Sequence, residues 1–402
     1  MLISWASQQQ AFKPAVQLDF TTGALDPRIT FARSSTGTYV NSTGVLTSAP
    51  ANTPRFDYDP ATLAPKGLLI ESQRTNLLLR SEEFDNASWV KANATITANI
   101  AVSPDGTMDA DKLIATVANS QHRVDFATTS AAATHAFSVY AKPAGYNFLL
   151  IRLGVNGGYV NLSDGTVAGV TSGYTLTATP AGNGWYRVVL VGAAALNEVA
   201  RINVTETVAT DFAGDGTSGI FVWGAQLEAG SFATSYIPTV ASQVTRAADQ
   251  ASIVAPNFAP WYNQSEGTFV VEAVTQKPTS LVATVIAIDA SDGGINNRHY
   301  IGVVSASAEV RTVNGGSVQS LLTQAYTANV IEKYAYAVKA NDFAFARNGN
   351  IVGTDTSGSM PTIDRMFIGN AAGSAAYFNG HIRSIRYFPT RLSNAQLQAL
   401  SA

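Results

Sequence analysis

The sequence predicts an all-β protein with two antiparallel β-sandwich or jelly-roll domains, preceded by an extended, irregular N-terminal segment. Short stretches rich in β-branched and aromatic residues recur, for example at residues 137–141, 148–153 and 185–190. Asn-Gly and Asp-Gly pairs between such stretches supply the positive φ angles of tight hairpins. Short strands separated by frequent turns are typical of sandwiches and jelly rolls. The turn pairs begin at Asp105, Asn156, Asp164, Asn183, Asp215, Asn314, Asn348 and Asn379.

The 402 residues are enough for two or three domains, and the pattern divides them into four parts. Residues 1–70 are irregular and rich in Pro, Ser and Thr, so we expect no self-contained core there and a need for a partner. Residues 71–237 form the first strand-rich block and residues 253–402 the second. Residues 238–252 lack strand periodicity and are interpreted as a linker.

Two elements near the C-terminus are predicted in detail. Residues 343–352 form a hairpin around Asn348-Gly349, with Phe343 and Phe345 on one face because side chains alternate along a strand. Ser393 is expected to cap the one good helix candidate, a short helix that ends near residue 400.

Composition excludes several classes of function. Lys and Arg total 25 against 28 Asp and Glu, and this net charge of −3 argues against non-specific binding to nucleic acid or to anionic membranes. The most apolar stretch, residues 188–196, is far shorter than the roughly 20 residues of a membrane helix, so we expect no membrane insertion. The absence of Cys excludes disulfides, a thiol nucleophile and thiolate metal ligands.

A collinear set of short stretches between residues 30 and 250 resembles virion proteins of tailed bacteriophages, namely tail-fibre, head-fibre or capsid-decorating proteins. The stretches are residues 30–40, 54–60, 67–78, 81–84, 104–106, 110–113, 137–142, 184–188, 223–230 and 244–249.

Each strand-rich block also resembles a sugar-recognition fold. Residues 71–237 are similar to the jelly roll of a carbohydrate-binding module. The second block is similar to the laminin-G or concanavalin-type lectin sandwich, chiefly through residues 378–388 and 392–397.

This resemblance implies a non-enzymatic component on the exterior of a phage particle. Residues 1–70 would attach it to other virion proteins, and the two sandwiches would be displayed outward as lectin-like modules for host-surface polysaccharide. Linked copies raise avidity, and fibres are symmetric assemblies, so we expect a homotrimer. Two alternatives stay open: a capsid or tail cement protein without receptor binding, and a polysaccharide depolymerase.

The sequence nominates no catalytic residue. It contains no His-Glu-x-x-His, Gly-x-Ser-x-Gly or Walker motif. Gly214–Gly219 matches the dinucleotide fingerprint as a string, but it runs directly into a strand and lacks the helix that holds a pyrophosphate, so we predict a hairpin loop. Glycoside hydrolysis needs two carboxylates that flank one bond. The candidates are too scattered to nominate a pair: Glu71, Glu82, Glu83, Glu228, Glu272 and Glu309.

No metal site or cofactor is predicted. The four histidines, His122, His135, His299 and His381, have no metal-ligand spacing and are interpreted as strand or core residues. The densest acidic cluster is Asp105, Asp109 and Asp111. Calcium is one interpretation of it, but a turn at Asp105 followed by a strand with one buried, hydrogen-bonded Asp is favoured.

Aromatic side chains are the remaining candidates for sugar contact, because an aromatic face packs against the apolar side of a sugar ring. Tyr146, Tyr159 and the Trp261-Tyr262 pair lie near Gly or Asn. A core position is favoured for each, so no binding residue is assigned. Trp89, Trp185 and Trp223 are predicted to lie in cores.

Overall fold

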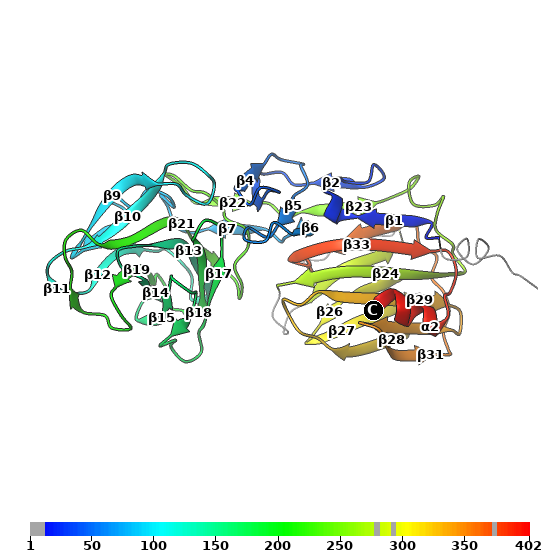
Figure 1. Ribbon diagram of the computed structural model, residues 1–402. Coiled ribbons are helices and arrows are strands. Elements are labelled where there is room, and N and C mark those ends of the chain that lie inside the picture. Colours follow the sequence, from blue (N-terminus) through cyan, green and yellow to red (C-terminus); the bar gives the residue numbers. More distant parts are fainter. Residues whose placement is uncertain (1–12, 277–281, 291–294, 372–375) are drawn as a thin grey trace, which may run out of the picture.

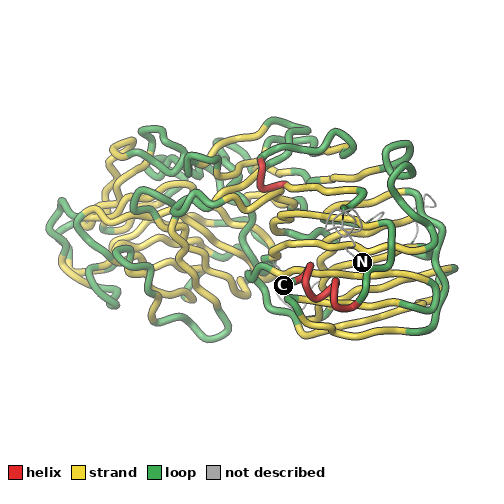
Figure 2. The backbone as a smooth tube through the Cα atoms, turned by 45° about the vertical axis from the view of Figure 1, so that its right-hand side comes forward, coloured by secondary structure: helices red, strands yellow, loops and turns green. Residues whose placement is uncertain are grey.

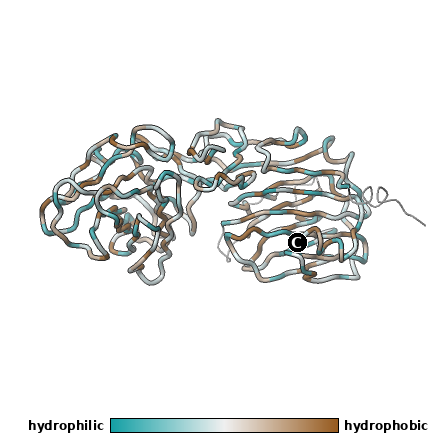
Figure 3. The backbone as a smooth tube through the Cα atoms, in the orientation of Figure 1, coloured by the Kyte–Doolittle hydropathy of each residue, from teal (hydrophilic) through white to brown (hydrophobic). Residues whose placement is uncertain are grey.

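The computed structural model describes residues 13–276, 282–290, 295–371 and 376–402. Figures 1 and 2 show two β-bodies side by side, with strands almost throughout; within the described residues, helix occurs only as the two short pieces η1 and α2. Hydrophobic and hydrophilic residues alternate along many of the strands (Figure 3). The predicted all-β class with two antiparallel sandwiches is confirmed. Residues 1–12 of the predicted N-terminal segment lie outside the described residues.

The first sandwich consists of two six-stranded antiparallel sheets around one apolar core. We call them the β13 sheet and the β14 sheet. The β13 sheet has the order β17-β18-β13-β21-β10-β9: β9 (Ala94–Ala101), β10 (Ala110–Ala115), β13 (Ala133–Ala144), β17 (Thr175–Pro180), β18 (Tyr186–Ala194) and β21 (Gly219–Ala229). The β14 sheet has the order β16-β15-β14-β19-β12-β8: β8 (Val90–Ala92), β12 (His122–Ala127), β14 (Phe148–Leu153), β15 (Asn156–Asn161), β16 (Val167–Ala168) and β19 (Val199–Thr205). A small ladder pairs β11 (Asn119–Ser120) with β20 (Phe212–Ala213).

The second sandwich packs the β24 sheet against the β26 sheet. The β24 sheet has the order β31-β30-β29-β24-β33-β6-β5, and β1 also pairs with β33: β1 (Val16–Asp19), β5 (Phe56–Tyr58), β6 (Pro65–Ile70), β24 (Glu266–Thr275), β29 (Glu332–Lys339), β30 (Phe343–Arg347), β31 (Asn350–Asp355) and β33 (Gly380–Phe388). The β26 sheet has the order β2-β23-β32-β25-β26-β27-β28: β2 (Thr30–Ala32), β23 (Gln250–Ile253), β25 (Ala283–Asp289), β26 (Arg298–Val304), β27 (Ser307–Asn314), β28 (Ser317–Ala325) and β32 (Arg365–Ile368).

The N-terminal segment packs into the second sandwich of the same chain. Strands β1, β5 and β6 extend the β24 sheet and β2 extends the β26 sheet, so both sheets of the second sandwich begin with N-terminal residues (Figure 1). Leu18, Phe20 on the 3-10 turn η1 (Phe20–Thr22), Leu68 and Ile70 are buried in that core. The expected boundary at residue 70 therefore differs from the structure, because these apolar side chains complete a sandwich that residues 253–402 do not close alone.

A hairpin from the same segment reaches the first sandwich. Strands β3 (Gly37–Val40) and β4 (Leu46–Ala49) pair with each other, and Leu46 packs with Tyr140, Trp185, Trp223 and Tyr236 on the outer face of the β13 sheet. The N-terminal segment thus contacts both sandwiches.

The residues interpreted as a linker also carry regular structure. Strand β22 (Val244–Arg246) pairs with β7 (Arg74–Asn76), and β23 begins at Gln250 in the β26 sheet. Residues 238–252 therefore differ from an irregular linker. Their strands are short, and their partners lie far away in sequence, so periodicity does not reveal them.

The two elements predicted in detail near the C-terminus are present. Strands β30 and β31 form the hairpin, and Phe343 and Phe345 both point into the core. Ser393 caps α2 (Asn394–Ser401) with a capping box. Leu397 packs on the outer face of the β24 sheet against small side chains such as Ala335 and Ala344, so the helix lies close to the sheet.

Candidate functional site

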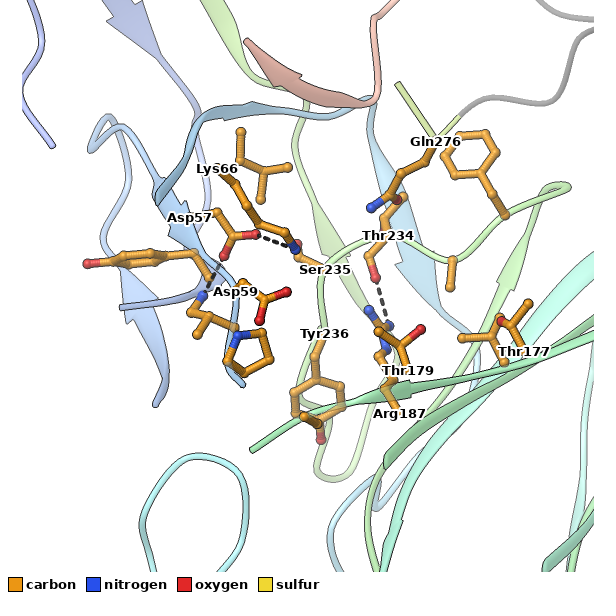
Figure 4. Close-up of a pocket in the computed structure, with 18 of the residues that line it drawn as sticks. Asp57, Asp59, Lys66, Thr177, Thr179, Arg187, Thr234, Ser235, Tyr236 and Gln276 are labelled. Carbon is orange, nitrogen blue, oxygen red and sulfur yellow. Dashed lines mark hydrogen bonds and ion pairs between the residues drawn. The ribbon is translucent and has the colours of Figure 1, made fainter. Parts of the chain in front are cut away.

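A cavity of about 750 Å³ lies where the two sandwiches and the N-terminal segment meet. We call it the interdomain cleft. Figure 4 shows side chains from the β17–β18 edge of the β13 sheet on one side and from the turn between β5 and β6 on the other. The β3–β4 hairpin, the loop that follows β21, the end of β24 and the start of β33 also contribute to the lining, together with Pro104, Ala328 and Asn329.

Edge strand β17 lines the cleft with hydroxyl groups. Leu176 faces the core of the first sandwich, so the alternating Thr175, Thr177 and Thr179 face outward into the cleft. All three threonines are exposed. This wall presents neutral donors and acceptors to a ligand.

Arg187 on β18 adds a positive charge that is held in place. Its Nη2 donates to the carbonyl oxygen of Thr234 at 2.7 Å and to the hydroxyl of Ser138 at 3.3 Å. Its guanidinium also lies over the ring of Tyr140, 5.6 Å from the centroid. Arg187 is therefore an ordered cation beside the threonine wall.

Asp57 on β5 joins the opposite wall to the second sandwich. Its Oδ2 accepts a hydrogen bond from Nε2 of His381 at 2.8 Å and lies 3.7 Å from Nζ of Lys66. Its Oδ1 accepts from the Val40 amide at 2.7 Å. Burial opposes ionisation, but the hydrogen bond from His381 and the nearby charges hold the pKa of Asp57 below its usual value. Lys66 is the more exposed partner, with 39% of its side chain accessible.

A buried ion cluster adjoins the cleft through Glu71. Asp249 accepts from Arg33 at 3.0 Å and from Arg55 at 2.5 Å, and Arg55 also pairs with Glu71 at 2.8 Å. Arg246 lies 3.5 Å from Glu71. No side chain of the five is more than 4% exposed. The cluster joins the N-terminal segment to the loop between the sandwiches.

Glu71 belongs to the cluster and also lines the cleft. Its two carboxylate oxygens accept from the backbone amide and the hydroxyl of Ser235, each at 2.7 Å. Burial penalises the charge, but Arg246 and Arg55 hold the pKa of Glu71 well below its usual range. Glu71 thereby fixes the cleft loop at Ser235 as an ionised anchor.

The sequence patterns did not predict this cluster, although they contain a signal for it. All five charged residues lie within stretches that carry the resemblance to phage virion proteins: residues 30–40, 54–60, 67–78 and 244–249. These stretches are far apart in the chain and meet at one buried point. A shared structural cluster is a physical reason for them to occur together.

The six glutamates that were weighed for hydrolysis have separate partners. Among the described residues, none of the six is hydrogen-bonded to another. The pairs are Glu71 with Arg55, Glu82 with Tyr236, Glu83 with Arg80, Glu228 with Thr234, Glu272 with Arg383 and Glu309 with Arg311.

The acidic cluster of the first sandwich follows the favoured interpretation. Asp105 accepts from the amide of Thr107 at 2.9 Å in a turn, and buried Asp111 accepts from the amides of Phe84 and Asn99. No group of three or more His, Asp or Glu side chains suited to a metal occurs in the part of the chain that the structure describes. That same part holds no helix long and apolar enough to span a membrane.

The glycine-rich string is a loop that leads into β21, as predicted, and Asp215 closes it by accepting from the Thr217 and Ser218 amides. The loop is not the expected hairpin, because β20 before it pairs with β11 and not with β21.

All four histidines are buried. His122 contacts the carbonyl oxygens of Asn93 and Phe212, and His299 contacts the Thr312 hydroxyl. Burial lowers the pKa of His299 to about 3, so this ring is neutral. His135 contacts the carbonyl oxygen of Ala133. Only His381 lines the interdomain cleft.

Most of the aromatic candidates lie in cores. Trp89, Trp185 and Trp223 are buried, as predicted. Trp261 and Tyr262 pack in the second sandwich, where Trp261 donates to the carbonyl oxygen of Asn257 at 2.7 Å. Two tyrosines differ from them. Tyr146 lies at the edge of the first core against Phe212, and Tyr159 is half-buried on β15. Neither lines the interdomain cleft, whose rings are Tyr39, Tyr140, Phe232 and Tyr236.

Glu82, beneath the cleft loop, predicts a measurable pH dependence. Tyr236 donates to its carboxylate at 2.9 Å, but burial raises the pKa of Glu82 to about 6. The folded state therefore binds its proton more tightly than the unfolded state, and stability falls as the pH rises from about 4.5 through 6. In Glu82→Gln we expect this pH-dependent loss of stability to disappear. The free energy of unfolding at pH 7 would then be about 1 kcal/mol higher than in the unmodified protein, after allowance for partial exposure of Glu82.

Urea unfolding of both proteins at pH 4.5 and 7.5 tests this expectation. Glu83→Gln is the matched control, because Glu83 is adjacent, has 40% of its side chain accessible and is paired with Arg80. Identical pH dependence in Glu82→Gln and the unmodified protein would contradict the assignment.

No protein-family model matches the chain, and no curated protein matches it. Solved structures with a partly similar fold include the CBM40 domain of the Ruminococcus gnavus IT-sialidase, at 15% identity over 37% of this chain and 89% of that domain, with a TM-score of 0.32. The NanB sialidase of Streptococcus pneumoniae matches at 20% identity over 37% of this chain and 26% of its own, with a TM-score of 0.32. The receptor-binding domain of botulinum neurotoxin mosaic serotype C/D matches at 13% identity over 38% and 39%, with a TM-score of 0.30.

Proposed function

We propose that this protein is a carbohydrate-binding adhesin and that the interdomain cleft is its glycan site. The observation that carries the proposal is the lining of the cleft. It combines outward-facing hydroxyls of Thr175, Thr177 and Thr179 with amide, carboxylate and guanidinium groups and with tyrosine rings. Sugars need many directed hydrogen bonds together with apolar ring faces. The volume of about 750 Å³ falls within the roughly 300–1,000 Å³ of small-ligand sites.

The electrostatics of the cleft favour binding over hydrolysis. A glycosidase needs a general acid whose pKa is raised towards neutrality. The carboxylates that line the cleft are Asp57, Asp59 and Glu71, and the pKa of each is lowered by hydrogen bonds and nearby cations that outweigh burial. Ionised carboxylates suit acceptance of hydrogen bonds from sugar hydroxyls.

Thr177→Trp tests the site directly. Thr177 is exposed on an edge strand, so an indole there fills the cleft without entering a core. We expect host-surface oligosaccharide binding, measured by calorimetry, to fall at least tenfold with little change in thermal stability. Thr95→Trp is the matched control, because Thr95 is exposed on β9, the opposite edge strand of the same sheet, and does not line the cleft. Equal loss in both variants, or no loss in Thr177→Trp, would contradict the proposal.

Release of reducing ends from host polysaccharide by the purified protein would instead favour the depolymerase alternative.

We further propose a place on the exterior of a phage particle. This proposal is supported by the collinear resemblance over residues 30–250. Attachment to other virion proteins would use the N-terminal segment through the surface that its strands leave exposed. A homotrimer would give the avidity that weak sugar sites need. Sedimentation of the purified protein and electron microscopy of intact particles test these points, and a monomer at micromolar concentration would contradict the trimer.

Particles that carry Thr177→Trp separate adhesion from a cement role. If adsorption to cells is unchanged while particles remain intact, the cement alternative is favoured. Deleting residues 253–402 is a poorer test, because β1 and β6 would lose their partner β33 and the N-terminal strands would lose the core that they share with the second sandwich.

A further inference from the structure

The outer face of the β14 sheet, the face that points away from the core, carries a group of charged and polar side chains. On β19, Ile202 and Val204 face the core, so Arg201, Asn203 and Thr205 face away from it. The same alternation places other side chains on this face: Leu150 and Arg152 of β14, Arg123 and Asp125 of β12, and Tyr159 of β15.

The strand register brings these side chains into two neighbouring rows. Leu150 is opposite Asn203, and Asn203 is opposite Arg123. One step along, Arg152 is opposite Arg201, and Arg201 is opposite Asp125. Tyr159 lies beside Leu150 on the next strand. Opposed side chains in a sheet lie within contact distance, so the rows form one continuous patch.

Asn203 at the centre of the patch lacks hydrogen-bond partners. It is 0% exposed, and among the described residues neither its amide nitrogen nor its amide oxygen has a partner. The hydroxyl of Thr205, also 0% exposed, has none either. An unpaired buried polar group costs about 1–3 kcal/mol, so such groups call for a specific explanation. A ligand whose donors and acceptors reach these atoms would be such an explanation.

The patch also holds more positive than negative charge. Asp125 lies 3.0 Å from Arg123 and 3.6 Å from Arg201, so one carboxylate serves two guanidiniums. Arg152 makes no ion pair or side-chain hydrogen bond with any residue in the described ranges. Burial, together with the charges of Arg201 and Arg123, lowers the pKa of Arg152 and outweighs the opposing influence of Tyr159 and Asp211.

We infer that this patch, Arg123, Arg152, Arg201, Asn203 and Tyr159, binds a sugar that bears a carboxylate. The guanidinium of Arg152 receives the carboxylate, since its fork matches the two oxygens. The Asn203 amide pairs with an adjacent hydroxyl, and the ring of Tyr159 offers an apolar face. The inference rests on the proposed function for its ligand class, carbohydrate, but the site is separate from the interdomain cleft.

Three variants of the full chain test the inference. In Arg152→Ala we expect affinity for oligogalacturonate to fall at least tenfold, and in Arg152→Lys to recover only in part, because an ammonium lacks the fork. Asn203→Ala should weaken the same binding without lowering the unfolding temperature, because it removes a buried group that has no partner in the free protein. Arg28→Ala, which removes an arginine paired with Asp26 outside the patch, is the matched control.

Calorimetry with a panel of sialylated and uronate-containing oligosaccharides, and with neutral oligosaccharides of equal length, reads out the result. The inference is supported if Arg152→Ala loses binding of acidic ligands only, while Thr177→Trp still binds the acidic ligands. Whether Thr177→Trp also binds neutral ligands does not affect this outcome. It is overturned if no carboxylated sugar binds, if Arg152→Ala binds acidic ligands as well as Arg28→Ala does, or if their binding follows Thr177→Trp. Loss of neutral binding in Thr177→Trp reports on the cleft alone, so the two proposals fail separately.

Discussion

Asp249→Asn is expected to destabilise the protein by about 3–5 kcal/mol, the typical cost of removing one partner from a buried ion network. Asp249 is fully buried and accepts from Arg33, from Arg55 and, at 2.9 Å, from the backbone amide of Glu71. An amide in its place keeps the shape but removes the charge. Three buried arginines, including Arg246, would then face Glu71 alone, and their desolvation would be uncompensated.

Because the cluster joins the N-terminal segment to the loop between the sandwiches, Asp249→Asn should lower both the unfolding temperature and the affinity of the cleft for its ligand. Scanning calorimetry measures the unfolding temperature, and titration with a cleft-binding oligosaccharide measures the affinity. Asp164→Asn is the matched control, since exposed Asp164 closes a turn by accepting from Thr166, a bond that Asn also accepts. A change below about 1 kcal/mol in Asp249→Asn would mean that solvent or rearrangement replaces the network.

The sequence predicted local structure well, and the physical reason is that local signals decide it. Hairpins such as residues 343–352 follow from strand alternation and a turn pair a few residues apart. The capping box at Ser393 depends on Gln396, three residues away. Trp89, Trp185 and Trp223 were predicted to lie in cores because they occupy strand-like positions or positions in the stretches that carry the family resemblance, and all three are buried.

The cluster and the cleft required information that periodicity does not contain. Arg33 and Asp249 are separated by 216 positions, and nothing in either neighbourhood states that they meet. The cleft takes its walls from β17, from the N-terminal segment and from the end of β24, so its composition follows from tertiary packing alone. The missing hydrogen-bond partners of Asn203 could not be predicted from the sequence either, because they depend on which groups surround this side chain in the folded protein.

Because the N-terminal segment forms part of the second sandwich, a substitution in this segment should destabilise that sandwich. Phe20 lies on η1, where Asp19 caps the turn by accepting from the Thr21 amide, and its ring is 1% exposed within the core of the second sandwich. Phe20→Ala is expected to destabilise that sandwich by about 3–5 kcal/mol, although Phe20 is more than 200 positions from Ile253. Amide hydrogen exchange should accelerate in β24 and β33 while β13 and β18 keep their protection.

Phe137→Ala gives the reciprocal result, because Phe137 is fully buried in the core of the first sandwich. Exchange should then accelerate in β13 and β18. Unchanged protection of β24 and β33 in Phe20→Ala would mean that the N-terminal strands are peripheral and detachable. The expected outcome instead means that residues 16–70 are part of the folded second sandwich. If the proposed attachment to a particle uses these residues, it uses the outer surface of strands that are already paired, and anchoring and display would then belong to a single folded unit.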